Sequence, residues 1–107
     1  MKAANVSISG VEEAVAKYTV EMFGLTSVVS GKRKVEMELG ENVKLTDIVH
    51  GLKKVAPSLA GEVIHRDTDY LMEGFAFNIN GRFYSDDRNL VLKESDRIIL
   101  LAMATIG

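Results

Sequence analysis

The chain has 107 residues, a formal net charge of −2 and no cysteine, which predicts one domain with a single core and without disulfides or cysteine-based metal sites. A slightly acidic protein lacks the basic surface that nucleic-acid backbones require, so we expect no nucleic-acid partner. Because no run approaches the ~18 apolar residues of a membrane span and residues 1–18 lack the apolar centre of a signal peptide, we also expect a cytoplasmic protein without a membrane partner.

The first part of the chain predicts an extension followed by a β-hairpin. Residues 1–17 stand outside the pattern of the rest, and the capping-box sequence from Ser9 to Glu12 predicts a short helix there. Apolar and polar residues alternate over residues 19–25 and, more strictly, over residues 34–39, as in strands with one buried face. The polar connection between them contains Gly31, so we expect the two strands to pair as a hairpin.

A change of period marks the main helix. Apolar residues recur at helical spacing between residues 45 and 56: Leu45, Ile48, Val49, Leu52, Val55 and Ala56. Thr46 is the candidate N-cap, Asp47 carries the negative charge that a helix N-terminus favours, and Pro57 ends the helix. Gly51 lies inside this helix, at a cost of about 1 kcal/mol relative to alanine.

The second half of the chain predicts a loop and then more strands. Residues 57–74 show little periodicity and predict one short turn within residues 59–64, followed by an acidic loop. Phe75, Phe77 and Ile79 alternate as in a strand, and Asn80-Gly81 predicts a type I′ hairpin turn. The continuous apolar run of residues 98–103 predicts a central strand, covered on both faces. One helix packed on one face of a small sheet makes an α+β domain.

Few side chains could carry chemistry. His50 lies on the polar side of the helix, where a solvated imidazole is expected. His65, Asp67 and Asp69 occupy alternate positions and could share one face of an extended segment. A metal site, however, needs three or four ligands and supporting hydrogen bonds that the sequence does not show. No glycine-rich phosphate loop or nucleophile elbow is present, so we expect no metal, no permanently bound cofactor and no enzyme activity of the chain by itself.

The last residues are the remaining feature. After the apolar strand the chain continues through small residues to Gly107. Termini are commonly frayed, and a single glycine is a weak signal. The residues alone therefore leave two interpretations open: an unused end, or the working part of the protein.

Several segments together resemble the ubiquitin-like β-grasp proteins of the MoaD/ThiS class. They are Phe23-Gly24, "SGKRKVEMEL", "LTDIVHGLKKVAP", "FAFNINGR" and "LVLKESDRIILLAMATIG". The resemblance covers residues 18–107 and implies a β-grasp domain, with a mixed sheet of four to five strands, that ends in a glycine tail. Residues 57–74 look like the longer insertion of the molybdopterin-type and modifier-type members.

The resemblance also implies a function for the tail. In this class an ATP-using activating enzyme of the ubiquitin-activating type adenylates the C-terminal carboxylate, which here belongs to Gly107, and a thiocarboxylate follows. By analogy Met103, Ala104, Thr105 and Ile106 form the partner-binding tail. The chain looks most like the small subunit of molybdopterin synthase, a sulfur donor in molybdenum or tungsten cofactor biosynthesis, which implies the large subunit of that enzyme as a partner.

Two other functions stay open at this point. The chain could be a protein modifier joined through Gly107 to lysines, or a β-grasp interaction domain whose tail is not activated. The class normally ends in two glycines, whereas Ile106 precedes Gly107 here. Either a further glycine follows in the natural chain, or one glycine suffices, or activation has been lost.

Overall fold

The computed structural model describes residues 15–103, so the capping-box sequence from Ser9 to Glu12 lies outside the described part. The expected helix does not extend over residues 16–18, because they belong to a strand. In chain order its elements are β2 (Ala16–Met22), α2 (Leu25–Ser30), β3 (Lys34–Leu39), β4 (Asn42–Lys44), α3 (Leu45–Val55), the 3₁₀ helix η1 (Pro57–Leu59), β5 (Phe75–Ile79), β6 (Phe83–Ser85), β7 (Val91–Lys93) and β8 (Ile98–Ala102). Every helix among these residues is too short or too polar to cross a bilayer.

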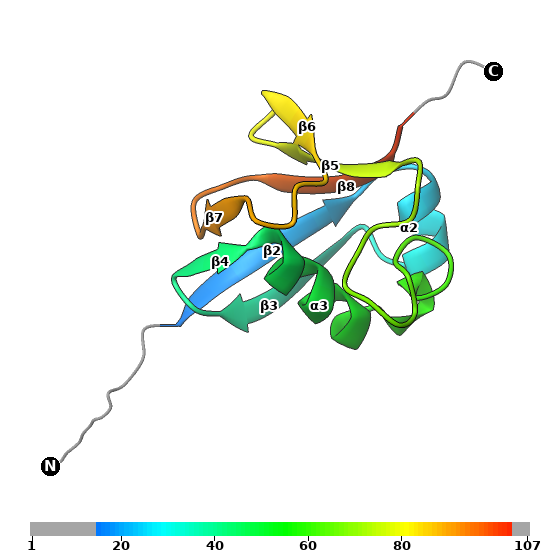
Figure 1. Ribbon diagram of the computed structural model, residues 1–107, viewed down its shortest axis with the longest axis horizontal. Helices are drawn as coiled ribbons and strands as arrows, with labels where there is room; N and C mark the ends of the chain where they lie inside the picture. The colour runs from blue at the N-terminus through cyan, green and yellow to red at the C-terminus, as the bar shows by residue number, and fades with distance from the viewer. Residues whose placement is uncertain (1–14, 104–107) are drawn as a thin grey trace, which may run out of the picture.

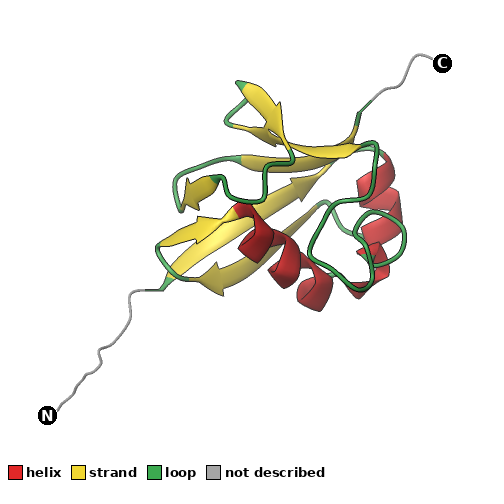
Figure 2. Ribbon diagram, viewed as in Figure 1, coloured by secondary structure: helices red, strands yellow, loops and turns green. Residues whose placement is uncertain are grey.

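The described residues form one mixed sheet with a helix against one face (Figures 1 and 2). The five strands follow the order β3-β2-β8-β5-β6, and β4 pairs with β7 as a separate two-stranded ribbon. β2 and β8 are parallel, whereas the other neighbours in the large sheet are antiparallel. The predicted α+β architecture, the pairing of the first two strands and the central place of residues 98–102 are confirmed.

The core lies between α3 and the sheet face that it covers. β2 buries every second residue toward this core, and Val20, Ile98 and Leu100 have no exposed surface. Gly51 faces β3 across this layer, and a Cβ atom there would lie 2.6 Å from the sulfur of Met37. The glycine that the sequence marks as unfavourable in a helix therefore lets α3 approach β3 closely.

The segment after the first strand differs from its prediction. β2 begins at Ala16 and ends at Met22, and residues 25–30, expected as strand end and polar connection, form α2. Gly24 adopts a φ of 62°, which stops the extended chain where the alternation of the sequence becomes irregular. Because α2 packs against β8 and η1, its helical state depends on tertiary contacts that a pattern of six residues does not reveal.

The start of α3 also differs from its prediction. The N-cap position belongs to Lys44, and Thr46 lies within the helix. The predicted acidic residue of the first turn does contribute, because the Asp47 carboxylate accepts a hydrogen bond of 2.9 Å from the Lys44 amide. This is one of the two hydrogen bonds of a capping box, and it forms although the N-cap residue has no hydroxyl.

The Asn80-Gly81 turn is confirmed, and it does more than reverse the chain. Asn80 and Gly81 have φ values of 57° and 68°. The Asn80 amide group donates to Asp96 at 2.9 Å and its carbonyl accepts from the Arg97 amide at 2.7 Å. Burial raises the pKa of Asp96, but hydrogen bonds from Asn80 and the Lys93 amide outweigh it and hold that pKa below its usual value. The turn thus fixes the start of β8.

We expect substitutions of Asn80 to separate backbone from side-chain effects. Asn80→Gly keeps the positive φ but loses both side-chain hydrogen bonds, and should lower the free energy of unfolding by about 1–2 kcal/mol. Asn80→Ala adds the strain of a left-handed backbone, for about 1 kcal/mol more. Urea unfolding of both variants tests this, and equal stability of the two would contradict the strain.

Candidate functional site: the root of the C-terminal tail

Strand β8 carries the chain to the edge of the described structure. It pairs with β2 on one side and β5 on the other, and Met103 beyond its end donates from its amide to the Gly74 carbonyl at 2.7 Å. Met103 is 37% exposed and is the one predicted tail residue within the described part. Ala104, Thr105, Ile106 and Gly107 lie outside it. The tail root is therefore a well-paired strand end.

A buried threonine connects this strand end to α2. Thr26 has no exposed surface, and its hydroxyl donates to the Leu100 carbonyl at 2.7 Å. The same oxygen accepts from the Phe23 amide at 3.1 Å, and the Phe23 amide also lies 3.2 Å from the Leu100 carbonyl. The Thr26 hydroxyl therefore joins the end of β2 and the start of α2 to one of the last carbonyls of β8. The sequence analysis missed this residue, and the only local signal is a threonine two residues after a glycine.

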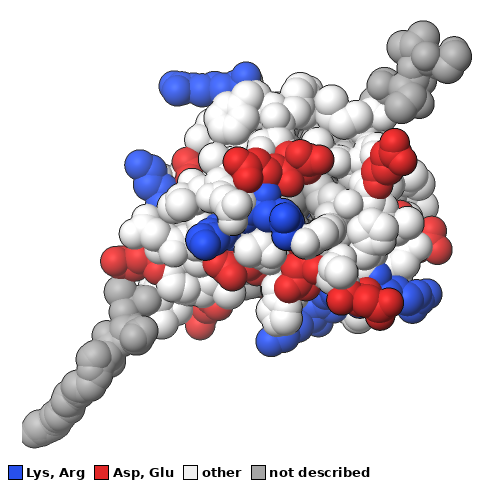
Figure 3. All heavy atoms as spheres, viewed as in Figure 1, with Lys and Arg blue, Asp and Glu red and all other residues white. Residues whose placement is uncertain are grey.

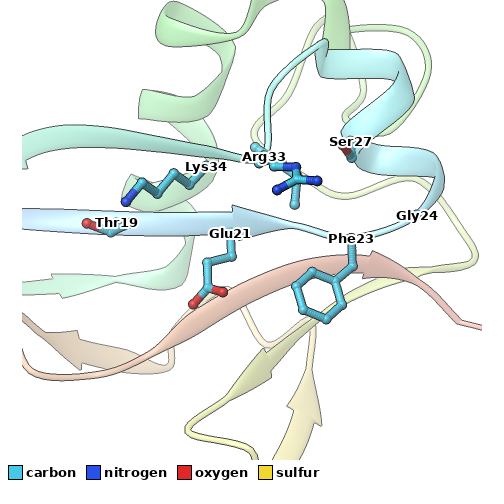
Figure 4. Close-up of a pocket in the computed structure, with 8 residues that line it drawn as sticks. Thr19, Glu21, Phe23, Gly24, Ser27, Arg33 and Lys34 are labelled. Carbon is cyan, nitrogen blue, oxygen red and sulfur yellow. The ribbon is translucent and has the colours of Figure 1, made fainter.

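Exposed apolar side chains lie on the elements that meet at the root. Phe23, Leu25 and Val28 are at least half exposed, and Met103 is partly exposed. We call these four residues the tail-root surface. In Figure 4 the Phe23 ring lies across the ribbon of β8, on the same side of β2 as Glu21. Exposed aromatic and aliphatic side chains beside a chain end are typical of a surface that docks another protein.

A shallow groove runs along β2 next to the tail-root surface. It is lined by Thr19, Glu21, Met22, Phe23, Gly24, Ser27, Arg33 and Lys34. Figure 4 shows Arg33 and Lys34 on one side of β2 and Glu21 on the other. The groove thus combines an apolar end, at Phe23, with charged side chains.

Glu21 forms a bidentate ion pair, the one such pair among the described residues. Arg97, the residue before β8, donates to its two carboxylate oxygens at 2.8 and 3.0 Å. These hydrogen bonds hold the pKa of Glu21 below its usual value and raise that of Arg97. The pair joins the outer face of β2 to the start of β8, away from the core.

Two of the histidine and aspartate candidates, His50 and Asp69, take part in contacts between α3 and the loop that follows it. Lys53 of α3 donates to the carbonyls of Arg66 and Thr68 and approaches the Asp69 carboxylate at 3.5 Å, while His50 lies 3.1 Å from the same carboxylate. The segment that holds His65 and Asp67 is bent, and residues 15–103 contain no group of three metal-binding side chains. Asp69 thus ties the loop to α3. Figure 3 shows acidic and basic side chains interspersed on this face.

Comparisons with known proteins identify the fold. No family model matches the chain, and no curated protein matches it. Among solved structures, SAMP1 of Haloferax volcanii superimposes with a TM-score of 0.72 at 18% identity, covering 86% of this chain and 100% of its own. The small archaeal modifier protein 1 of Methanosarcina acetivorans gives 0.66 at 22% identity, over 88% and 99%.

A third solved structure is a Pyrococcus furiosus protein whose proposed identity is molybdopterin converting factor subunit 1. It gives a TM-score of 0.63 at 24% identity and covers 83% of this chain and 99% of its own. All three matches span nearly the whole of the other protein. The chain therefore has the ubiquitin-like β-grasp fold that its sequence segments predict.

The buried hydroxyl of Thr26 should matter more than its methyl group. Thr26→Val keeps the shape but leaves the buried Leu100 carbonyl without its shortest partner, so we expect a loss of about 1–3 kcal/mol in unfolding free energy. Thr26→Ser keeps the hydroxyl and should lose only about 1 kcal/mol. Amide exchange of Phe23 should accelerate in the valine variant alone; unchanged exchange there would refute the role of the hydroxyl.

The ion pair of Glu21 predicts a pH-dependent stability. Because the folded pKa of Glu21 is lowered, its contribution is complete above the unfolded pKa and is lost as the pH falls through the folded pKa. Glu21→Gln should therefore cost at most about 1 kcal/mol near neutral pH, as for other exposed pairs. In acid, where the wild-type carboxyl is protonated, the two proteins should become equal.

Urea unfolding at several pH values measures this difference. Glu73→Gln is the matched control, because Glu73 is exposed and has no ion pair within residues 15–103. A difference between wild type and Glu21→Gln that persists in acid would contradict the ion pair as its cause.

Proposed function

We propose that the chain is a sulfur carrier that works through the carboxylate of Gly107. The observation that carries this proposal is the tail root: a central strand, paired on both sides, leads directly into the last residues beside an exposed apolar surface. Such an arrangement gives a partner a rigid surface to bind while the chain end enters its active site. The likeness of the fold to small archaeal modifiers and to a molybdopterin converting factor subunit supports the same reading.

The proposed chemistry has two steps. The carboxylate oxygen of Gly107 attacks the α-phosphorus of ATP in the activating enzyme, forming an acyl-adenylate and releasing pyrophosphate. Hydrosulfide, HS⁻, then attacks the acyl carbon and displaces AMP, and loss of a proton leaves a thiocarboxylate. Glycine suits this position because a residue without a Cβ can enter a narrow catalytic channel without steric conflict. The chain binds no cofactor of its own in this scheme, and ATP belongs to the activating enzyme.

The acceptor that we propose is a molybdopterin precursor held by the large subunit of a molybdopterin synthase. The support is the fold shared with the Pyrococcus furiosus protein and the insertion between α3 and β5. The large subunit would contact the tail-root surface and the sheet face opposite α3. Because activation consumes ATP, the proposed carrier is cytoplasmic.

Conjugation to protein lysines is the second candidate. The likeness to two small archaeal modifier proteins favours it, because both carry the word modifier in their names. Here a lysine amine replaces the sulfur nucleophile, displaces AMP and forms an amide with Gly107. Both functions require activation of Gly107. Both therefore require that the activating enzyme accommodate the β-branched side chain of Ile106, which precedes the reactive residue.

Intact mass tests the proposed function. We expect the protein, incubated with an activating enzyme of the ubiquitin-activating class, ATP and a sulfide source, to gain the mass of one oxygen replaced by sulfur. A variant without Gly107 is the control and should gain nothing. If Ile106 hinders entry, Ile106→Gly should react faster than wild type.

The other outcomes separate the candidates. A mass gain equal to a second protein minus water, with a branched peptide at a lysine after trypsin, would indicate conjugation. No reaction of the wild type, of Ile106→Gly or of a variant with an appended glycine would refute activation and leave an interaction domain.

A further inference from the structure

Strand β3 is an outer strand with one hydrogen-bonded neighbour in the described sheet, β2. The Met22 amide donates to the Arg33 carbonyl at 2.7 Å, so Arg33 faces β2 in a hydrogen-bonded pair. In an antiparallel ladder such pairs recur at every second residue, which directs the amides and carbonyls of Lys34, Glu36 and Glu38 away from β2. β3 therefore presents a row of main-chain donors and acceptors along its outer edge.

A groove follows this edge, between β3 and the second half of α3. It is lined by Lys17, Glu36, Met37, Glu38, Leu39, His50, Gly51, Lys54 and Val55. The wall toward α3 combines the apolar side chains of Met37, Leu39 and the partly exposed Val55 with two polar residues of the helix, His50 and Lys54. The opposite side carries Glu36 and Glu38, whose side chains are exposed. At Gly51 the backbone of α3 itself lines the groove, beside the sulfur of Met37.

The inner neighbour of β3 shows which residues this strand accepts beside it. Along β2, Lys17 lies opposite Glu38, and its ammonium group is 3.8 Å from the carboxylate of Glu36. The next residue, Tyr18, lies opposite Met37 and is buried. Basic residues opposite the glutamates and apolar residues opposite Met37 would meet the same surroundings on the outer side.

We propose that the outer edge of β3 binds an extended segment of a partner protein in which apolar and basic residues alternate. The segment adds a strand to the sheet through the main chain of Glu36 and Glu38, as in other cases of β-strand addition. Its apolar side chains pack on Met37, Leu39 and Val55, and its basic side chains pair with the two glutamates. For a second copy of this chain, the antiparallel register that sets Met37 opposite Met37 also sets Glu36 opposite Glu38, which is unfavourable. A register with Glu36 opposite Lys34 pairs opposite charges, so a second copy is a separate outcome of the experiments below.

This site differs from the tail root in place and in chemistry. β2 separates β3 from β8, so a segment bound at the outer edge leaves the strand that carries the tail in place. The inference does not depend on the proposed function: a partner could bind β3 whether or not Gly107 is activated. One partner could thus hold the protein at β3 while another acts on the tail.

An end-blocked peptide of alternating valine and lysine, eight residues long, is the probe. With the full chain we expect NMR shift changes centred on β3, and slower exchange of the Glu36 and Glu38 amides with solvent. At a peptide concentration about ten times Kd, exchange at these two amides should slow by about tenfold. Peptides of alternating valine and glutamate, and of serine and lysine, should bind at least about tenfold more weakly. Equal binding of all three peptides, or shifts centred elsewhere, would overturn the proposal.

Two sets of variants test the residues. Glu36→Lys with Glu38→Lys should abolish binding of the valine-lysine peptide and permit the valine-glutamate peptide, whereas Glu62→Lys with Glu73→Lys changes net charge equally and should do neither. Glu38→Pro and Glu38→Gln both remove the carboxylate, but only proline also removes the amide donor that points away from β2. The proline variant should therefore fold, and should bind at least about fivefold more weakly than Glu38→Gln. Equal binding by these last two variants would refute main-chain pairing.

The other occupants give distinct results. If the Glu36 and Glu38 amides are protected in the free full chain and a variant lacking residues 1–14 loses that protection, the chain's own N-terminal segment fills the groove. If protection instead rises with protein concentration together with the apparent mass in gel filtration, a second copy fills it. Either result overturns the proposed partner segment.

Discussion

The pairing of β8 between β2 and β5 is the constraint on which the rest of the structure depends. β8 joins the first strand of the described chain to strands formed some sixty residues later, in parallel on one side and antiparallel on the other. Its inward residues, Ile98 and Leu100, have no exposed surface and pack in the same core as α3. Without this strand, β2-β3 and β5-β6 would be two separate hairpins, each too small to be stable alone.

The site inherits its properties from the same strand. A chain end that leaves a central strand is anchored by hydrogen bonds on both sides up to its last described residues. Here the Thr26 hydroxyl binds the Leu100 carbonyl, and the Gly74 carbonyl binds the Met103 amide. The proposed carrier function would use this combination, because a partner would recognise a fixed surface while the chain end reaches its active site. The outer strand β3, by contrast, has main-chain groups without a partner in the described sheet, so the centre and the edge of the sheet suit different kinds of binding.

Prediction from sequence succeeded where a pattern along a single helix or strand shows which of its residues are buried. Alternation located β3 and β5, the helical stripe located α3, and Asn80-Gly81 located a turn that requires positive φ. It failed at α2 and at the cap of α3, where the outcome depends on contacts with distant residues. The role of Gly51 is of the same kind: its cost in a helix is local, whereas its benefit, contact with Met37, appears only after packing.

By itself the sequence determined the fold class, the main helix, the central strand and the chemical character of the last residues, because each follows from periodicity or from residue type along a continuous segment. Only the tertiary structure decided which residues meet across the sheet. It placed Thr26 on Leu100, Glu21 on Arg97 and Asp69 on Lys53, and it left β3 at the outer edge. Partners so far apart in sequence are chosen by strand order and register, which no local pattern encodes.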